Sequence, residues 1–363
     1  MDIKELFKAM IESEASDLFL KVGSPVQLRI DGLLKPFDSA VLYQNDMRRV
    51  IDTIMDDLQR KRFEKEREVD FAVTIENLGR FRASVFHQSG MPGAVFRHIK
   101  SKIRTFEELN LPSKVLSRLS FEKRGLVLIT GATGSGKSTT IASMIEYINQ
   151  NLPYHVFTIE DPIEFKFEDK KSLIEQRELG ADTPTYIDAL KHIMYQSPDV
   201  IFIGNIRDRE TMSAAINAAE TGQLVLSTIH SVNATQTVER IVNFYPPYQH
   251  LEVRIQLSLL LKGVISQRLV PKADEKGRIP ACETMILTPT IAGLIREGKT
   301  NEIINYIEEG RSLGMESFDQ YLANLCKEKK VTIEEARKFC DSVEVLELAL
   351  KGIKRTETGP RQT

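Results

Sequence analysis

The sequence predicts an α/β protein in which a small α+β domain precedes a mostly parallel sheet that is covered by helices. Three observations carry this prediction. Before residue 100, short segments of alternating apolar residues surround helical stretches, which is typical of an antiparallel meander with its own core. From Arg124 onward, apolar strand-like runs alternate with helical stretches. The four runs span residues 126–129, 156–159, 200–203 and 224–226. After them the pattern becomes helical.

These patterns give the expected domain boundaries. We expect the α+β domain over residues 1–100, a linker over 101–115, the α/β domain over 116–285, C-terminal helices over 286–352 and a disordered tail over 353–363. The tail has no apolar residue after Ile353. In the first domain, an apolar stripe predicts one helix between Asn45 and Phe63 with Asn45 as its N-cap.

A glycine-rich loop joins the first strand of the α/β domain to the helix that follows. Residues 125–138 read GLVLITGATGSGKS and contain the pattern G-x-x-x-x-G-K-S. In this context backbone N–H groups and the helix N-terminus can hold an anion, with Lys137 on the β and γ phosphates and the Ser138 hydroxyl on Mg²⁺. The expected nucleotide contacts are Gly131, Thr133, Gly134, Ser135, Gly136, Lys137, Ser138 and Thr139. The alternative is an ordinary glycine-rich turn with an exposed lysine.

Composition disfavours several classes of protein. The net charge is −2 and the pI is near 6.4, so the basic field of a dedicated nucleic-acid binder is missing. We expect no signal peptide and no membrane span. The three cysteines form no CxxC pair and are expected to be buried packing residues, and the six histidines show no metal-ligand spacing. The only metal implied is a nucleotide-bound Mg²⁺.

Polar residues directly follow the other strand-like runs, where ligands of parallel sheets bind. Residues 160–164 supply three carboxylates, Glu160, Asp161 and Glu164, which could hold Mg²⁺ through water or activate a water molecule. Their alternative role is helix capping. His230 follows the fourth run and can report a γ phosphate, or else cap a helix. Asn205 follows the third run, where a hydrolase of this kind would use a carboxylate.

Arginines also gather on one strand face of the first domain. Arg82 lies on the face opposite the apolar side chains of its strand, and Arg97 lies near the start of the next apolar segment. From the residues alone, a solvated polar face is the favoured interpretation.

In a long, ordered set of motifs, the chain closely resembles the type IV pilus retraction ATPases, the PilT and PilU group of the secretion ATPase superfamily. The motifs are GATGSGKST, TIEDPIEF, IGNIRDRETM, AAETGQLVLSTIHS, ASDLFL and GRFRASVF. The similarity runs from about Ala15 to past Glu335. The absence of the paired CxxC motifs of assembly-type relatives points to retraction rather than extension.

The resemblance implies a homohexamer that powers pilus retraction and twitching motility by ATP hydrolysis. It implies a PAS-like N-terminal domain, a RecA-like P-loop ATPase domain with ATP at the seam between them, and a C-terminal helical segment. The implied location is the cytoplasm at the inner face of the bacterial inner membrane, which the protein reaches only through partners. The implied partner is the pilus platform protein, with action beside a second retraction ATPase left open and no nucleic acid involved.

The family pattern also assigns residues. It makes residues 131–138 the Walker A loop, residues 160–164 the aspartate box and His230 the histidine box. Arg82 and Arg97 match arginines that contact nucleotide at the seam, which reverses the solvated-face interpretation. Glu164 matches a candidate general base. The catalytic candidates are therefore Glu160, Glu164, Asn205 and His230, and Asp161 joins the nucleotide contacts.

Three departures from the family pattern stand out. The Walker B glutamate is Asn205, whose amide can orient a water but cannot accept its proton at neutral pH. An arginine usual in the preceding helix is Tyr195. The motif usually read AIRNLIRE is TIAGLIRE at residues 290–297, for which Thr288, Pro289 and Gly298 predict a capped helix. The glycine within it suggests close approach or weak local order.

Two functional hypotheses follow. The first is a Mg²⁺-dependent ATPase that drives pilus disassembly. The second is a subunit that binds ATP but hydrolyses it poorly and acts as an accessory or regulatory partner, because Asn205 replaces the glutamate. A P-loop kinase would leave the N-terminal domain and the LIRE segment unexplained.

Overall fold

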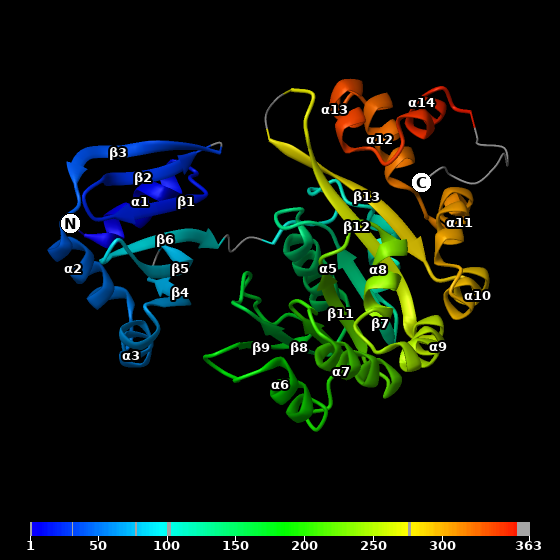
Figure 1. Ribbon diagram of the computed structural model, residues 1–363, viewed down its shortest axis with the longest axis horizontal. Helices are drawn as coiled ribbons and strands as arrows, with labels where there is room; N and C mark the ends of the chain where they lie inside the picture. Colours follow the sequence, from blue (N-terminus) through cyan, green and yellow to red (C-terminus); the bar gives the residue numbers. More distant parts are fainter. Residues whose placement is uncertain (1, 31, 77, 100–102, 275–276, 354–363) are drawn as a thin grey trace. The chain divides into compact units, whose positions relative to one another are not determined.

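A computed structural model describes residues 2–30, 32–76, 78–99, 103–274 and 277–353. The chain divides into two compact units (Figure 1). The first comprises Met1–Lys102 together with Pro162–Lys166, and the second comprises Ile103–Asp161 together with Phe167–Thr363. Each unit has its own sheet and its own apolar core, so the predicted α/β fold class is confirmed.

The first unit is built on an antiparallel sheet with the strand order β3-β2-β1-β6-β5-β4. Its elements are α1 (Ile3–Glu12), β1 (Asp17–Lys21), β2 (Pro25–Ile30), β3 (Leu33–Val41), α2 (Gln44–Ile54), α3 (Asp57–Glu66), β4 (Glu68–Ile75), β5 (Gly79–Gln88) and β6 (Met91–Ile99). The fully buried Phe7 of α1 stacks on Phe81 of β5 at 4.0 Å between ring centroids. One face of β5 is therefore core, and its other face carries Arg82.

The single helix expected between Asn45 and Phe63 is wrong. The chain forms α2 and α3, which are separated at Met55 and Asp56. Asp56 accepts a hydrogen bond from the Gln59 backbone at 2.8 Å, and the Gln59 side chain accepts one from the Asp56 backbone at 3.1 Å. This capping box starts a new helix where the apolar stripe alone predicts continuation.

The second unit contains a sheet with the strand order β13-β12-β7-β11-β10-β8-β9, parallel except for β13. Its strands are β7 (Gly125–Thr130), β8 (His155–Glu160), β9 (Leu173–Glu178), β10 (Val200–Ile203), β11 (Leu224–Ile229), β12 (Leu261–Pro271) and β13 (Arg278–Ile286). The four predicted runs are confirmed as β7, β8, β10 and β11. The sequence pattern missed β9 and the long β12–β13 hairpin.

Helices surround this sheet in Figure 1. They are α4 (Ser113–Ser120), α5 (Lys137–Asn151), α6 (Tyr186–Ile193), α7 (Arg209–Glu220), α8 (Ala234–Val242), α9 (His250–Leu260), α10 (Pro289–Glu297), α11 (Ile303–Glu309), α12 (Phe318–Lys327), α13 (Ile333–Phe339) and α14 (Val343–Leu350), with short 3₁₀ turns at Pro247–Gln249, Thr300–Glu302 and Gly310–Leu313. None of the helices in the described ranges is long and apolar enough to cross a bilayer.

The segment expected to be a linker is largely part of the second unit. Phe106 and Leu111 are buried in its core, and α4 begins at Ser113. Residues 101 and 102 lie outside the described residues, as do residues 354–363 of the expected tail.

The last helices form a separate small core on the β12–β13 hairpin. Phe318 and Leu322 of α12 are fully buried against Val270 of β12 and Ile279 of β13. Figure 1 shows α12 to α14 gathered at the far end of this hairpin. The C-terminal helices are thereby attached to strands of the main sheet.

Helix α10 confirms the predicted caps of the LIRE segment. Thr288 accepts a hydrogen bond from the Ile291 backbone at 3.2 Å, Pro289 is the first helical residue, and Gly298 ends the helix with φ +74°. The close approach suggested for Gly293 is wrong, because a Cβ there would meet no atom within 4 Å.

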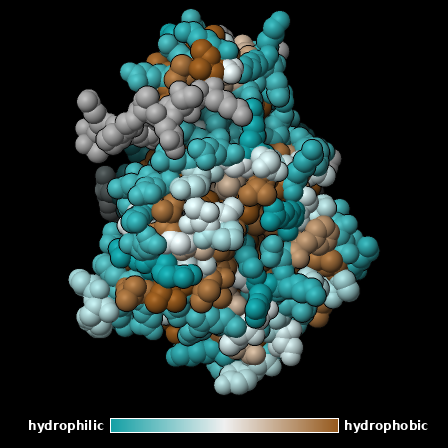
Figure 2. Space-filling view, turned by 90° about the vertical axis from the view of Figure 1, so that its right-hand side faces the viewer, coloured by the Kyte–Doolittle hydropathy of each residue, from teal (hydrophilic) through white to brown (hydrophobic). Residues whose placement is uncertain are grey.

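An apolar stripe on α9 stays exposed. Leu251, Ile255 and Leu259 recur at helical spacing with 40–65% of each side chain accessible, and Tyr248 precedes them at 83%. Figure 2 views the side of the second unit that carries α9 to α11 and shows apolar patches in its lower half. Such patches are typical of surfaces that contact other proteins.

Candidate functional site

The glycine-rich loop follows β7 and ends where α5 begins at Lys137. Gly131, Gly134 and Gly136 adopt φ of +144°, +78° and +96°, a region that side chains disfavour. A Cβ on Gly131 would lie 2.5 Å from the backbone oxygen of Gln267 on β12, so this position admits only glycine. The backbone thus forms a cradle at a helix N-terminus, which is suited to an anion.

Lys137 lies buried in this cradle. Its Nζ donates to the carbonyl oxygens of Gly131 at 2.9 Å and Ala132 at 2.8 Å. The ammonium therefore stands among backbone groups of the loop itself, where it can also meet the phosphates of a ligand. The exposed-lysine alternative is wrong.

Other loop side chains differ in accessibility. Ser135 is buried, and its Oγ has no hydrogen-bond partner. An orphaned hydroxyl inside the cradle fits a ligand that carries acceptor oxygens. Thr133 is exposed, whereas Ser138 and Thr139 are half-buried in the first turn of α5. Ser138 is thus accessible to a nucleotide-bound ion.

The carboxyl ends of the parallel strands meet at the same edge as this loop. β11 and β12 flank β7, and β10 and β8 come next. Asn205 follows β10, and its Oδ1 is buried without a hydrogen-bond partner. The neighbouring Thr228 hydroxyl of β11 donates to the Gly204 carbonyl at 2.6 Å, which fixes the turn on which Asn205 stands. The amide oxygen is therefore held in place with its acceptor capacity unused.

Glu160 ends β8 and is buried, with 7% of its surface exposed. Its Oε1 accepts hydrogen bonds from Thr158 at 2.6 Å and Gln176 of β9 at 3.2 Å. The next residue, Asp161, is exposed. Glu160 is thus bonded to side chains of β8 and β9 at the strand end.

Tyr186 is a neighbour that the sequence did not reveal. A Cβ on Gly204 would lie 3.2 Å from the Tyr186 hydroxyl, which also hydrogen-bonds the Asn205 backbone. Burial, followed by the charge of Asp161, raises the pKa of Tyr186 to about 12. The phenol thus stays protonated between the ends of β8 and β10. No local pattern marks it, because it reaches this place from α6.

His230 follows β11 and is half-buried. Burial lowers its pKa, and the positive charges of Lys137, Arg207 and Arg240 lower it further, against a hydrogen bond to the Gly131 backbone that raises it. The ring is therefore neutral at pH 7 and contacts the cradle directly. The role of a capping histidine does not apply, since Asn233 caps α8.

The remaining predicted residues belong to the first unit. Arg82 and Arg97 are paired opposite one another on β5 and β6. Arg97 donates to Asp17 with Nε at 2.9 Å and approaches it with Nη2 at 2.8 Å, whereas Arg82 lies 3.9 Å from Asp70. Both guanidinium groups remain partly exposed. Glu164 belongs to the 162–166 segment of this unit and is exposed.

The expectation that all three cysteines are buried is confirmed for Cys282 and wrong for the others. Cys326 and Cys340 are only half-buried. Tyr195 is also not in a helix, because α6 ends at Ile193 and the tyrosine is 89% exposed after it. Within the described ranges, no three side chains of His, Cys, Asp or Glu come together in a group that could hold a metal ion.

Comparisons with known proteins agree with this geometry. The family model described as "Type II/IV secretion system protein" matches residues 1–349. The type IV pilus ATPase PilU of Pseudomonas aeruginosa is 41% identical over 351 residues, which cover 97% of this chain and 92% of that protein. The type IV pilus retraction ATPase PilT of the same organism is 44% identical over 337 residues, with 93% and 97% covered. A crystal structure of the pilus retraction motor PilT with bound ADP has a TM-score of 0.89 at 43% identity and covers 96% of this chain and 99% of that one.

Proposed function

This chain belongs to the type II/IV secretion system protein family, as an ATPase of the type IV pilus retraction group, and we propose that it binds and hydrolyses ATP at the loop of residues 131–138. The observation that carries the proposal is the cradle itself. Lys137 is buried against the loop carbonyls, and a Cβ at Gly131 would collide with β12. Both features leave the backbone N–H groups free of side chains at a helix N-terminus.

The residues around the cradle have complementary roles in the proposal. Thr133, Gly134, Ser135, Gly136 and Thr139 supply backbone and hydroxyl donors to the phosphates. Ser138 would hold Mg²⁺, which neutralises phosphate charge and orients the terminal phosphate. Glu160 and Asp161 orient water at the same edge. His230 senses the terminal phosphate from its contact with Gly131.

Proton transfer in the proposed reaction needs a carboxylate. Asn205 can hold the attacking water through its unpartnered Oδ1, but it cannot take the proton. Glu164 is therefore the proposed general base. Losing a positioned base typically lowers a rate about 10²- to 10⁴-fold, so Glu164 decides whether the chain is an efficient enzyme.

We further propose a homohexamer in which Arg82 and Arg97 meet the nucleotide. Their facing positions on β5 and β6 and their exposure support this role. The exposed apolar stripe on α9 supports contact with other chains. The proposed partner is the pilus platform protein, at the inner face of the bacterial inner membrane, and the proposed location is the cytoplasm. Action beside a second retraction ATPase is an extension of this proposal.

The second candidate function is an ATP-binding subunit that hydrolyses slowly and regulates an active motor. The amide at Asn205 favours it, because this is the position where a carboxylate would follow β10. Such a subunit would still bind ATP, because the phosphate-binding loop of residues 131–138 is unaffected by the amide at Asn205.

Phosphate release by the purified protein, measured together with binding of a fluorescent ATP analogue, separates the two functions. We expect turnover that disappears in Lys137→Ala and in Glu164→Gln, with nucleotide binding retained in Glu164→Gln. The matched control is Glu168→Gln, an exposed carboxylate four positions further along the chain. Wild-type turnover equal to that of Lys137→Ala, with binding intact, would refute the enzyme and support the regulatory subunit. A rise in Asn205→Glu would show that the amide limits the rate.

A further inference from the structure

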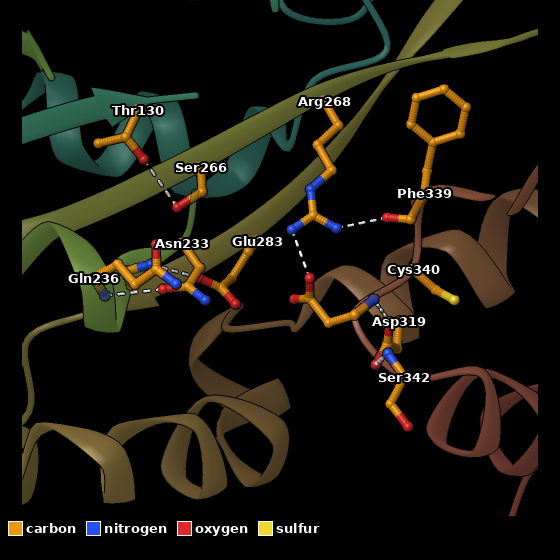
Figure 3. Close-up of polar contacts among 12 residues, drawn as sticks. Thr130, Asn233, Gln236, Ser266, Arg268, Glu283, Asp319, Phe339, Cys340 and Ser342 are labelled. Atoms are coloured by element: carbon orange, nitrogen blue, oxygen red, sulfur yellow. Dashed lines mark hydrogen bonds and ion pairs between the residues drawn. The ribbon is translucent and has the colours of Figure 1, made fainter. Parts of the chain in front are cut away.

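A carboxylate lies buried beneath the N-terminus of α8. Glu283 of β13 is 1% exposed, and its Oε1 accepts a hydrogen bond from the Ala234 backbone N–H at 2.7 Å. Figure 3 shows this side chain pointing at the start of α8. The first N–H groups of a helix have no partner within the helix, so Glu283 supplies one of them with an acceptor oxygen.

The first turn of α8 is tied to the loop that carries His230. Asn233 accepts from the Gln236 backbone at 2.9 Å, and the Thr237 hydroxyl donates to the Asn233 carbonyl at 2.7 Å. Ser231, directly after His230, shares a hydrogen bond of 2.6 Å with the same Thr237 hydroxyl. These hydrogen bonds join the loop to the start of the helix.

Glu283 also belongs to a polar row that reaches the nucleotide loop. It is paired in the sheet with Ser266 of β12, and the Thr130 hydroxyl of β7 donates to Ser266 at 3.0 Å. Thr130 is the residue before Gly131. Figure 3 shows Thr130, Ser266 and Glu283 across these neighbouring strands. Polar side chains thus follow one another across three neighbouring strands, from the end of β7 to the residue that bonds the start of α8.

We propose that Glu283 is a positioning residue of the nucleotide site, which fixes the start of α8 and through it holds the His230 ring beside Gly131. A residue that only filled the core would be apolar, since burying a carboxylate is costly. A hydrogen bond to a helix N–H that would otherwise be unpaired gives a reason for keeping it.

The groups around Glu283 act on its pKa in opposite directions. Burial raises the pKa of Glu283 to about 7, the Ala234 N–H and Arg268 of β12 act to lower it, and Asp341 and Asp319 act to raise it. Arg268 in turn pairs with Asp341 at 2.6 Å. Charged and neutral forms are therefore both populated near neutral pH, and both retain an acceptor oxygen for Ala234.

The inference rests on the proposed role of His230, so its test uses one readout that needs no turnover. Glu283→Gln keeps an acceptor of the same length, whereas Glu283→Met fills similar volume and leaves the Ala234 N–H unpaired. Diethylpyrocarbonate modifies neutral imidazoles, and its rate at His230 can be followed by mass spectrometry in the intact protein. The exposed His192 of α6 serves as the internal reference. Glu316→Met is the matched control, because Glu316 is a carboxylate that bonds Asn324 of α12 instead of α8.

In Glu283→Met we expect the His230 modification rate to change at least about threefold relative to His192, and the kcat for ATP to fall about 10- to 100-fold with little change in KM, as misplaced catalytic groups do. Glu283→Gln should stay within about threefold of wild type on both measures, and Glu316→Met should leave the His230 rate unchanged. An unchanged His230 rate in Glu283→Met would overturn the inference, as would equal effects of Gln and Met. If the wild type shows no turnover, the proposed hydrolysis fails while the modification rates still test Glu283.

Discussion

The loop of the nucleotide site contains two glycines that look alike in the sequence and are predicted to respond differently to alanine. Gly131 has φ +144°, and a Cβ there would lie 2.5 Å from both the Gln267 backbone oxygen and the Ser135 Oγ. Gly134 has φ +78°, and a Cβ there would meet no atom within 4 Å. Only the first position therefore combines backbone strain with a collision.

The magnitude follows from these contacts. A disfavoured φ costs about 1–3 kcal/mol. Overpacking against a backbone atom adds about 1–3 kcal/mol, since β12 is held between β7 and β13 and cannot give way. Gly131→Ala should therefore lower the free energy of unfolding by about 2–6 kcal/mol. Gly134→Ala should lower it by about 1–2 kcal/mol, from the left-handed backbone alone.

Urea unfolding of both variants and the wild type measures this difference, and binding of a fluorescent ATP analogue reports the cradle. We expect Gly131→Ala to lose most nucleotide binding and Gly134→Ala to keep more of it. Equal destabilisation by the two substitutions would refute the reasoning, because it would mean that β12 does not close the cradle.

Three further predictions concern other parts of the chain. Gly293→Ala should raise the free energy of unfolding by about 1 kcal/mol, since Gly293 lies inside α10 with open space at its Cβ; a loss of stability in urea would contradict the helix assignment. Arg268→Met should lower the free energy of unfolding by about 3 kcal/mol, because Asp341 loses its ion-pair partner and the Phe318 ring loses the cation that lies 3.8 Å from its centroid. It should also speed tryptic cleavage between α12 and α14. Unchanged cleavage would contradict the view that this contact attaches the C-terminal helices to β12. The pKa of Glu283 is about 7 in the folded state and 4.5 in the unfolded state, so between these pH values only the folded state keeps the proton. The wild-type free energy of unfolding should therefore fall by about 3 kcal/mol relative to Glu283→Gln as the pH rises between these values and stay level above them, which denaturation at pH 5, 6, 7 and 8 can measure.

Much of the fold could be predicted because the decisive interactions are local. Continuous apolar runs identify β7, β8, β10 and β11, since strands buried on both faces must be apolar throughout. The caps of α10 are visible because Thr288 and Gly298 act within one turn of the helix. The failure between α2 and α3 is also local. The apolar stripe predicts one continuous helix, whereas in the structure the capping box at Asp56 starts a second helix.

Site residues divide in the same way. The loop, Glu160, Asn205 and His230 each lie at or just after the carboxyl end of a strand, so the alignment of parallel strand ends brings them to one edge. Tyr186 and Glu283 reach this region from a helix and from an antiparallel strand, and nothing in their own neighbourhood of sequence marks them.

By itself, then, the sequence determined the class of fold, the phosphate-binding loop and the amide at Asn205, since these depend on residue identity and short-range geometry. Only the tertiary structure decided that β12 pairs with β7 and closes over Gly131, that Lys137 turns into the loop, and that Glu283 lies under α8. The physical reason is that strand register, helix packing and side-chain rotamers are set by how the whole core fills space, and the residue types near each position in the sequence do not determine them.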